Sequence, residues 1–368
     1  MRGARRPPSG RSPRFKDLAI EKQGAFAVIR DRTWEERVQF ARRWGITAAA
    51  LGLVIFLVLL GRRHGFGVPE YLQFALDGLR GGSIYALVAL GFVLVYRVMG
   101  VINFAQGAFV MLGPMLTAFF YEQGWPPVPG LRLALAASLA MGIVGALGMA
   151  VERLTLYPAR RASPLTRIII TVGVYLALQG AALLLWGPYA KVLPSFTTMS
   201  LSDPTLRFGG VRVKAQSLWI AGTLIATVIA LGLFFRHTTV GKAMRACAVN
   251  RLAARLMGIP VDTMSTLAFG MAAVLGAIAG IVLGPVTRAT YDMGLELGLK
   301  GFVAAIMGGL VSFPGAVLGG LVLGVLENLW AGVTVAGFKD LFAFVVLILV
   351  LLLHPRGFAG AEAAVERV

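Results

Sequence analysis

Few side chains in this sequence combine a chemically active group with an apolar surrounding. Glu327 lies in the apolar run at residues 321–330, and the amides of Asn103 and Gln106 lie in the segment GVINFAQG at residues 100–107. A charge at the centre of a membrane costs roughly 2.5–3.5 kcal/mol, so a carboxylate there is expected to face the interior of a helix bundle or water. Two interpretations are open for all three residues: they bond to neighbouring helices, or they line a polar path.

The reactive residue types give little support for metal binding, thiol chemistry, ATP binding or catalysis by this chain. The three histidines are dispersed and Cys247 is the one cysteine, so neither a metal site nor a thiol pair is expected. The sequence has no G-x-x-x-x-G-K-[ST] motif, which excludes ATP binding through a P-loop in this chain. Ser83 and Tyr85 have no plausible histidine and aspartate set beside them. We therefore expect neither an enzyme nor a cofactor in this chain.

Composition and hydropathy predict the elements that position these side chains. Hydrophobic residues make up 57% of the 368 residues and charged residues only 14%, whereas a soluble domain carries about 25% charged residues. This composition indicates an all-α polytopic membrane protein with about ten transmembrane helices. Apolar runs long enough to cross a core of about 30 Å recur at roughly 44–60, 72–98, 101–120, 130–151, 168–187, 215–235, 263–284, 297–312, 316–336 and 340–354.

The formal net charge of +18 is concentrated in three segments. Residues 1–43 carry 12 lysines and arginines against five acidic residues, residues 152–167 carry four arginines against Glu152, and residues 236–262 carry five basic residues against Asp262. Positive charge near short loops marks the cytoplasmic side, and counting spans from an internal N-terminus places all three segments inside. The loop 188–214 is also basic but is counted outside. Aromatic residues fall in apolar runs, so nucleic-acid binding is not expected.

Small residues recur at a spacing of four in two of the apolar runs, where they let helix backbones approach closely. Tight packing is one interpretation and hinges in a moving bundle are the other. The residues concerned are Gly276, Gly280, Gly284, Gly315 and Gly319.

The loop at residues 236–262 has the pattern of a short amphipathic helix. Gly241 suits a turn, and Gly258 suits a helix end with Pro260 just beyond it. The stretch between the two glycines is rich in alanine and carries arginines, which favours a helix. Such a helix either rests on lipid or docks into a groove on another protein.

From about residue 69 to residue 360 the chain resembles the permease subunits of bacterial branched-chain amino acid ABC importers, most closely the LivH type. The matching stretches occur in the family's order and together cover about four-fifths of the chain. They are GSIYALVALG at 82–91, GVINFAQG at 100–107, the loop at 241–259, LKGFVAAIMGGL at 299–310, PGAVLGG at 314–320 and LLHPRG at 352–357.

The resemblance implies an ABC importer permease core, at residues 69–360, in the inner membrane. An extra N-terminal helix with its loop at 44–68 precedes it, a basic cytoplasmic tail at 1–43 holds the N-terminus inside, and a C-terminal tail occupies 361–368. The implied partners are two cytoplasmic ATPase subunits that bind ATP, a second permease subunit of the LivM type that completes the pore, and an extracytoplasmic amino-acid-binding protein. Two interpretations of the tail are open: it binds anionic lipid, or it makes a regulatory contact.

The resemblance also implies roles for particular residues. The coupling loop, which docks into the ATPase, would use Arg245 and Arg251 as contacts to the partner. The residues expected to form this loop's contacts are Gly241, Arg245, Ala246, Arg251, Ala253, Leu256 and Gly258. Alternating access would use a cavity lined by helices near 83–107, 171–179 and 320–328, and the residues expected on this path are Ser83, Tyr85, Asn103, Gln106, Thr171, Gln179 and Glu327.

Two positions depart from the pattern of the family. Gln106 stands where the family usually has histidine, and Ala108 stands where an acidic residue is usual. The first 68 residues also exceed the family's usual length. Permeases for urea, short-chain amides or sugars in the same superfamily therefore stay open as alternatives, and a passive channel is a more remote one.

Overall fold

The computed structural model describes residues 52, 56, 59–63, 65–128, 130–197, 205–208, 210–334, 336–353 and 357. The chain divides into two units, residues 1–59 and 60–368, and nearly all described residues belong to the second. The expected tail at 1–43, most of the expected extra helix at 44–60 and the C-terminal tail at 361–368 lie outside the described residues.

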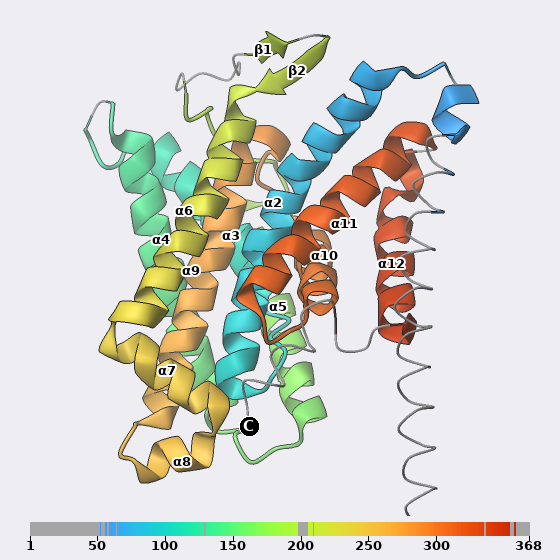
Figure 1. Ribbon diagram of the computed structural model, residues 1–368. Coiled ribbons are helices and arrows are strands. Elements are labelled where there is room, and N and C mark those ends of the chain that lie inside the picture. Colours follow the sequence, from blue (N-terminus) through green and yellow to red (C-terminus); the bar gives the residue numbers. More distant parts are fainter. Residues whose placement is uncertain are drawn as a thin grey trace, which may run out of the picture. The chain divides into compact units, whose positions relative to one another are not determined.

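The second unit is a bundle of helices with one small hairpin (Figure 1). The hairpin at the expected loop is β1 (Thr205–Phe208) with β2 (Val211–Lys214), paired antiparallel. The helices are α2 (Val68–Met99), α3 (Gln106–Glu122), α4 (Arg132–Val151) continued by the π-helical turn η1 (Glu152–Leu156), α5 (Pro164–Trp186), α6 (Ala215–His237), α7 (Thr239–Val249), α8 (Arg251–Leu256), α9 (Val261–Thr287), α10 (Met293–Gly308), α11 (Phe313–Val333), the 3-10 turn η2 (Ala336–Phe338) and α12 (Lys339–Leu353).

Six helices among the described residues are long and apolar enough to cross a membrane, which fits the all-α polytopic class. They are α2, α4 with η1, α5, α6, α9 and α11. The expected spans near 101–120, 297–312 and 340–354 correspond to the shorter helices α3, α10 and α12. The predicted total of about ten spans stays a prediction.

Helix α2 occupies the centre of the bundle. Its residues from Gly82 to Val95 are buried, and it packs against α9, α10 and α11. By contrast, α5 and α6 expose apolar side chains such as Leu184, at 89% exposure. In a membrane protein such faces meet lipid or another subunit, because no water there penalises an exposed leucine.

The chain between α2 and α3 is not helical, although the sequence predicts a span from residue 101. Helix α2 ends at Gly100, whose φ of 67° is left-handed, and α3 begins only at Gln106. The segment 101–105 between them is largely buried, with Asn103 at 0% exposure and Val101 at 2%. Non-helical backbone at membrane depth is tolerated only where protein surrounds it. The apolar run therefore contains a helix break that its composition conceals.

The two ends of the bundle differ in charge. One end, here called the basic face, carries α7, α8 and the turn at 157–163, and the other carries the hairpin, the start of α2 and the loops at 123–131 and 187–197 (Figure 1). This arrangement matches the predicted separation of the basic loops at 152–167 and 236–262 from the remaining loops. The structure does not include a membrane, so which end faces the cytoplasm is taken up below.

Candidate functional site

Three of the expected path residues meet at the break between α2 and α3. Asn103 Oδ1 accepts a hydrogen bond from the Ala105 N–H at 3.0 Å. Gln106 Nε2 donates to the Ala272 carbonyl of α9 at 2.9 Å. Thr171 Oγ1 of α5 accepts from the Phe104 N–H at 3.1 Å. These side chains replace the backbone hydrogen bonds that the break removes, which buried backbone requires. Their observed contacts are therefore bonds between segments of the bundle.

The two polar atoms that these contacts leave over are Asn103 Nδ2 and Gln106 Oε1, which are buried with no hydrogen-bond partner. Gln106 lies between α2 and α9, where glycines face it: a Cβ on Gly276 would lie 3.0 Å from Gln106 Nε2, and one on Gly91 would overlap the amide. A buried amide with half of its bonding capacity unused is costly. This polar spot is thus one place in the core with capacity for a further hydrogen bond.

A second polar cluster gathers around Lys300 of α10. Its Nζ lies 2.8 Å from Glu327 Oε1 of α11, 2.6 Å from Asp340 Oδ1 of α12 and 2.6 Å from Glu296 Oε1 on its own helix. Lys300 and Glu327 are 1% and 0% exposed. The Tyr85 ring of α2 lies 5.7 Å from Lys300 Nζ, within the range of a cation–π contact. One buried cation thus joins four helices of the bundle.

The remaining expected path residues lie apart from these clusters. Ser83 is buried and its hydroxyl donates to the Leu79 carbonyl of its own helix at 2.7 Å. Gln179 is half-buried on α5. The seven expected residues therefore do not line one cavity within the described part of the chain. A small hollow of about 50 Å³ lies beside the break, lined by Phe104, Val172, Tyr175, Gly294, Leu295, Gly298 and Leu299.

Lys300 escaped the sequence prediction, although it lies in the expected span 297–312 and within a matching stretch. Glu327 was expected to face an asparagine, a backbone group or a path, and its actual partner is a lysine from another helix. The available signal was simple, because a lysine inside an apolar run requires a counter-charge in the same way as a glutamate does. Pairing the two would have predicted the contact between α10 and α11.

The expected coupling loop forms two short helices on the basic face. Thr238 caps α7 by accepting from the Gly241 N–H at 2.9 Å. Asn250 then interrupts the helix and caps α8 by accepting from the N–H groups of Leu252 and Ala253, both at 3.0 Å. The sequence did not predict this interruption. Gly258, with a φ of 81°, follows the end of α8 as expected.

Gly241 does not form the expected turn. It lies in the first turn of α7 and is buried. A Cβ at this position would overlap the backbone of Phe234 and Phe235 at the end of α6. The glycine is therefore required by a close approach of α7 to α6, and the turn before it is made by Thr238.

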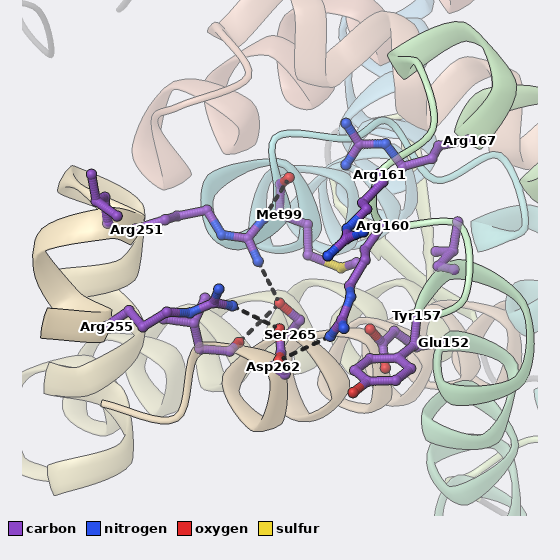
Figure 2. Close-up of a pocket in the computed structure, with 13 residues that line it drawn as sticks. Met99, Glu152, Tyr157, Arg160, Arg161, Arg167, Arg251, Arg255, Asp262 and Ser265 are labelled. Atoms are coloured by element: carbon purple, nitrogen blue, oxygen red, sulfur yellow. Dashed lines mark hydrogen bonds and ion pairs between the residues drawn. The ribbon is translucent and has the colours of Figure 1, made fainter. Parts of the chain in front are cut away.

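The two arginines expected to contact a partner behave differently. Arg245 on α7 is exposed and makes no ion pair in the part of the chain described. Arg251 is also exposed, but it donates to the Met99 carbonyl at 3.1 Å and to Ser265 Oγ of α9 at 3.0 Å (Figure 2). Burial lowers the pKa of the Arg251 guanidinium, while the nearby Cys247 raises it. Arg251 thus ties α8 to the end of α2 and to α9.

The remaining loop residues divide by exposure. Ala246 is half-buried, whereas Ala253 and Leu256 are exposed. Cys247 lies on the buried face of α7, and burial raises the pKa of its thiol. A protonated, enclosed thiol fits the incidental role expected for it. Together α7 and α8 leave four large apolar side chains exposed, at 68% to 83%: Val249, Leu252, Leu256 and Met257.

The glycines singled out by spacing lie at helix contacts. On α9, a Cβ on Gly276 would lie 3.1 Å from Phe109 Cβ, and a Cβ on Gly280 would overlap the Val110 carbonyl of α3. On α11, a Cβ on Gly319 would overlap the Ala304 carbonyl of α10. Gly284 faces Leu193, and Gly315 faces Gly308. At Gly280, Gly315 and Gly319 the contact is with backbone atoms, and at Gly276 and Gly284 it is chiefly with side chains. Larger residues at these positions would force the segments apart.

Comparison with known proteins identifies the family. Residues 74–351 match the family model described as branched-chain amino acid transport system / permease component. The chain belongs to this family. The match begins in α2 and ends in α12, so it includes both polar clusters and the α7–α8 pair.

Individual relatives agree with the family match. The chain is 34% identical over 306 residues to the high-affinity branched-chain amino acid transport system permease protein BraD of Pseudomonas aeruginosa, covering 82% of this chain and 99% of that protein. It is 34% identical over 309 residues to LivH of Escherichia coli K12, covering 81% and 98%. A xylose/arabinose import permease, XylH of Sulfolobus acidocaldarius, is only 25% identical over 61% of the chain.

Proposed function

We propose that this chain is the permease subunit of an ATP-driven importer that carries branched-chain amino acids, or related hydrophobic amino acids, across the inner membrane. Two cytoplasmic ATPase subunits would bind and hydrolyse ATP, a second permease subunit of the LivM type would complete the pore, and an extracytoplasmic binding protein would deliver the substrate. The basic face is then cytoplasmic and the N-terminus is inside, in keeping with the charge bias of membrane proteins.

The observation that carries the proposal is the exposed apolar surface of α7 and α8, within a chain of this family. Leu252, Leu256 and Met257 are exposed beside arginines on the basic face. An amphipathic helix with such anchors is suited to a groove on a partner protein. A cytoplasmic ATPase subunit is the partner that the family relationship supports.

The hydrogen bonds of Arg251 supply a route from this surface into the bundle. Arg251 holds the carbonyl of Met99, the last residue of α2, and Ser265 of α9. The helix break follows directly after Met99. A displacement of α8 by the ATPase would therefore pull on the end of α2 and on the start of the non-helical segment. Alternating access in this proposal begins with that displacement.

The pore in this proposal lies between two permease subunits and not within one. The expected path residues do not surround one cavity in this chain, whereas α5 exposes Leu165, Ile169 and Val172. Thr171 and Gln179 lie on the same helix. We assign the face of α5 to the subunit interface, where the second permease would complete the path.

Reconstitution with the partner subunits tests the coupling assignment. Leu252→Ser combined with Leu256→Ser should reduce co-purification of the ATPase subunits and abolish stimulation of ATP hydrolysis by the loaded binding protein. The matched control is Leu206→Ser on the hairpin, where the leucine is also exposed but lies at the opposite end of the bundle. Retention of full ATPase association and stimulation by the double variant would overturn the assignment.

Uptake measurements test the substrate separately. Labelled leucine uptake should be restored by the chain and its partners in a strain lacking its own leucine importer, and excess isoleucine or valine should compete. Restoration of urea, amide or sugar uptake without leucine uptake would support the alternatives instead. Leucine uptake that persists without ATP would favour a passive channel.

A further inference from the structure

A cavity of about 680 Å³ opens on the basic face beside α8 (Figure 2). Its walls come from six parts of the chain: the end of α2, η1, the turn after η1, and the starts of α5, α8 and α9. Arginines dominate the lining. The lining residues are Met99, Glu152, Leu156, Tyr157, Arg160, Arg161, Arg167, Arg251, Leu252, Arg255, Val261, Asp262 and Ser265.

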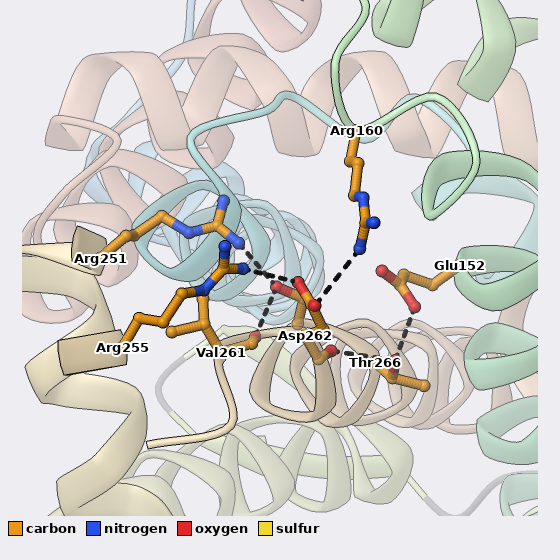
Figure 3. A network of polar contacts seen from close by, with 8 residues as sticks. Glu152, Arg160, Arg251, Arg255, Val261, Asp262 and Thr266 are labelled. Atoms are coloured by element: carbon orange, nitrogen blue, oxygen red, sulfur yellow. Dashed lines mark hydrogen bonds and ion pairs between the residues drawn. The ribbon is translucent and has the colours of Figure 1, made fainter. Parts of the chain in front are cut away.

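The carboxylates of the cavity are already engaged within the chain. Asp262 receives Arg160 at 3.4 Å and Arg255 at 3.2 Å (Figure 3). Glu152 Oε2 accepts from Thr266 Oγ1 at 2.6 Å. Two carboxylates against five arginines leave the lining with an excess of positive charge.

Three guanidinium groups have no carboxylate bonded to them among the described residues. Arg251 donates only to the neutral acceptors at Met99 and Ser265. Arg161 and Arg167 make no ion pair within the described part of the chain, and Arg167 Nε is buried there with no hydrogen-bond partner. Figure 2 shows Arg251 and Arg255 reaching in from α8 on one side and Arg160, Arg161 and Arg167 lying on the other. Guanidinium groups converging in this way suit a phosphate group.

The surroundings of the cavity suit a phospholipid head group. Arg167 lies in the first turn of α5, at the level where this membrane-spanning helix begins. Tyr157, with an amphipathic ring typical of membrane interfaces, lines the cavity. Leu154 of η1, three residues before Tyr157, is 75% exposed. A charged pocket at the start of a membrane-spanning helix, with an interfacial aromatic ring in its wall, is placed to receive such a head group.

We propose that this cavity binds the phosphate head group of an anionic phospholipid from the leaflet that contacts the basic face. Basic pockets between helices on the cytoplasmic side are suited to such head groups. The bound phosphate would join α8 to the start of α5 and to the turn after η1. The orientation of the site rests on the proposed function, but lipid binding is measured on the chain alone, so the two can fail independently.

Native mass spectrometry of the full chain in detergent, with added phosphatidylglycerol, tests the proposal. Arg161→Gln combined with Arg167→Gln should weaken the retained phosphatidylglycerol by about tenfold or more, since each charge-assisted hydrogen bond lost to the phosphate costs roughly tenfold in affinity. Phosphatidylcholine should bind equally to the wild type and the variant. The matched control is Arg236→Gln with Lys242→Gln, which removes the same charge from exposed positions on the same face outside the cavity and should leave binding unchanged.

Further measurements distinguish a phospholipid from a soluble phosphate and from an acidic side chain of the ATPase as the occupant of the cavity. A thermal shift produced equally by inorganic phosphate, with no additional effect of phosphatidylglycerol, would overturn the lipid assignment in favour of a soluble anion. Unchanged phosphatidylglycerol binding by the Arg161→Gln/Arg167→Gln variant would also overturn the lipid assignment. If that variant at the same time lost its association with the ATPase, the cavity would instead receive an acidic side chain of the ATPase. Arg161→Lys/Arg167→Lys, which keeps the charge, should retain most of the binding if the variant folds normally.

Discussion

The pair formed by Lys300 and Glu327 should respond very differently to removal of its two members. Their charged atoms lie 2.8 Å apart, at 1% and 0% exposure. Removing one partner of a buried pair costs about 3–5 kcal/mol, because the other charge remains buried without compensation. Lys300→Met leaves Glu327 in that condition.

The opposite change, Glu327→Gln, should be milder. Lys300 keeps Glu296 and Asp340, each at 2.6 Å. These carboxylates are 58% and 55% exposed, so each contributes no more than about 1 kcal/mol, but they still compensate the lysine. We expect a cost of about 1–2 kcal/mol from the lost bond to Glu327. In the double variant Lys300→Met/Glu327→Gln no buried charge is left unpaired, so its cost should fall short of the sum by about 2 kcal/mol or more.

The assay is the temperature at which the detergent-solubilised chain loses its monodisperse elution profile. This temperature should be highest for the wild type and lower for Glu327→Gln. The double variant should lie near Glu327→Gln, and Lys300→Met should have the lowest temperature. Lys339→Met, beside the cluster, is the control and should be nearly neutral. Additive costs, or a Lys300→Met variant no worse than Glu327→Gln, would refute the reasoning.

Three further variants address the rest of the bundle. Arg251→Lys keeps the charge but loses the fork that binds two acceptors, so transport per ATP hydrolysed should fall about tenfold; an unchanged ratio would contradict the proposed route. Gly280→Ala should lower the unfolding temperature, because the added methyl would overlap the Val110 carbonyl. Gly232→Ala is the control and should not lower it, since no atom lies within 4 Å of that position. Equal effects of the two substitutions would count against close packing at Gly280. Thr171→Val removes the acceptor for a backbone N–H at the break and should cost about 1–3 kcal/mol, measured as a drop in unfolding temperature.

The sequence predicted the long helices because their signal is local. Apolar runs report length, and their positions agree with α2, α4, α5, α6, α9 and α11. The side of the membrane read from the basic loops stays a prediction. The helix break at residues 101–105 escaped prediction because those residues are as apolar as their neighbours. Only the left-handed Gly100 and the amide of Asn103, which accepts from the Ala105 N–H, mark it. Glycine is also frequent within membrane helices and an asparagine can bond across helices, so residue type alone does not predict the break.

The polar contacts show the same division between local and tertiary information. Residues at fixed spacing on one helix, such as Gly276 and Gly280, could be singled out because periodicity places them on one face. The partner of Glu327 could not, since Lys300 belongs to another helix and the contact depends on how α10 and α11 pack. Arg251 was expected to contact a partner together with Arg245, and in the structure it bonds to Met99 and Ser265 of its own chain. Its direction is set by the interruption at Asn250, which turns α8 away from the axis of α7.

The helix break and the Arg251 contacts together place the most adaptable part of the core next to the basic face. Backbone inside a helix is held by its own hydrogen bonds, so a displaced end moves the whole helix. The segment after Met99 lacks that ladder and is held by side chains, chiefly Thr171 and Asn103. A movement of α8 passed through Arg251 is therefore expected to change the geometry at Gln106 before it moves α2 as a unit. A bundle so tightly packed through glycine contacts can otherwise shift only as rigid blocks.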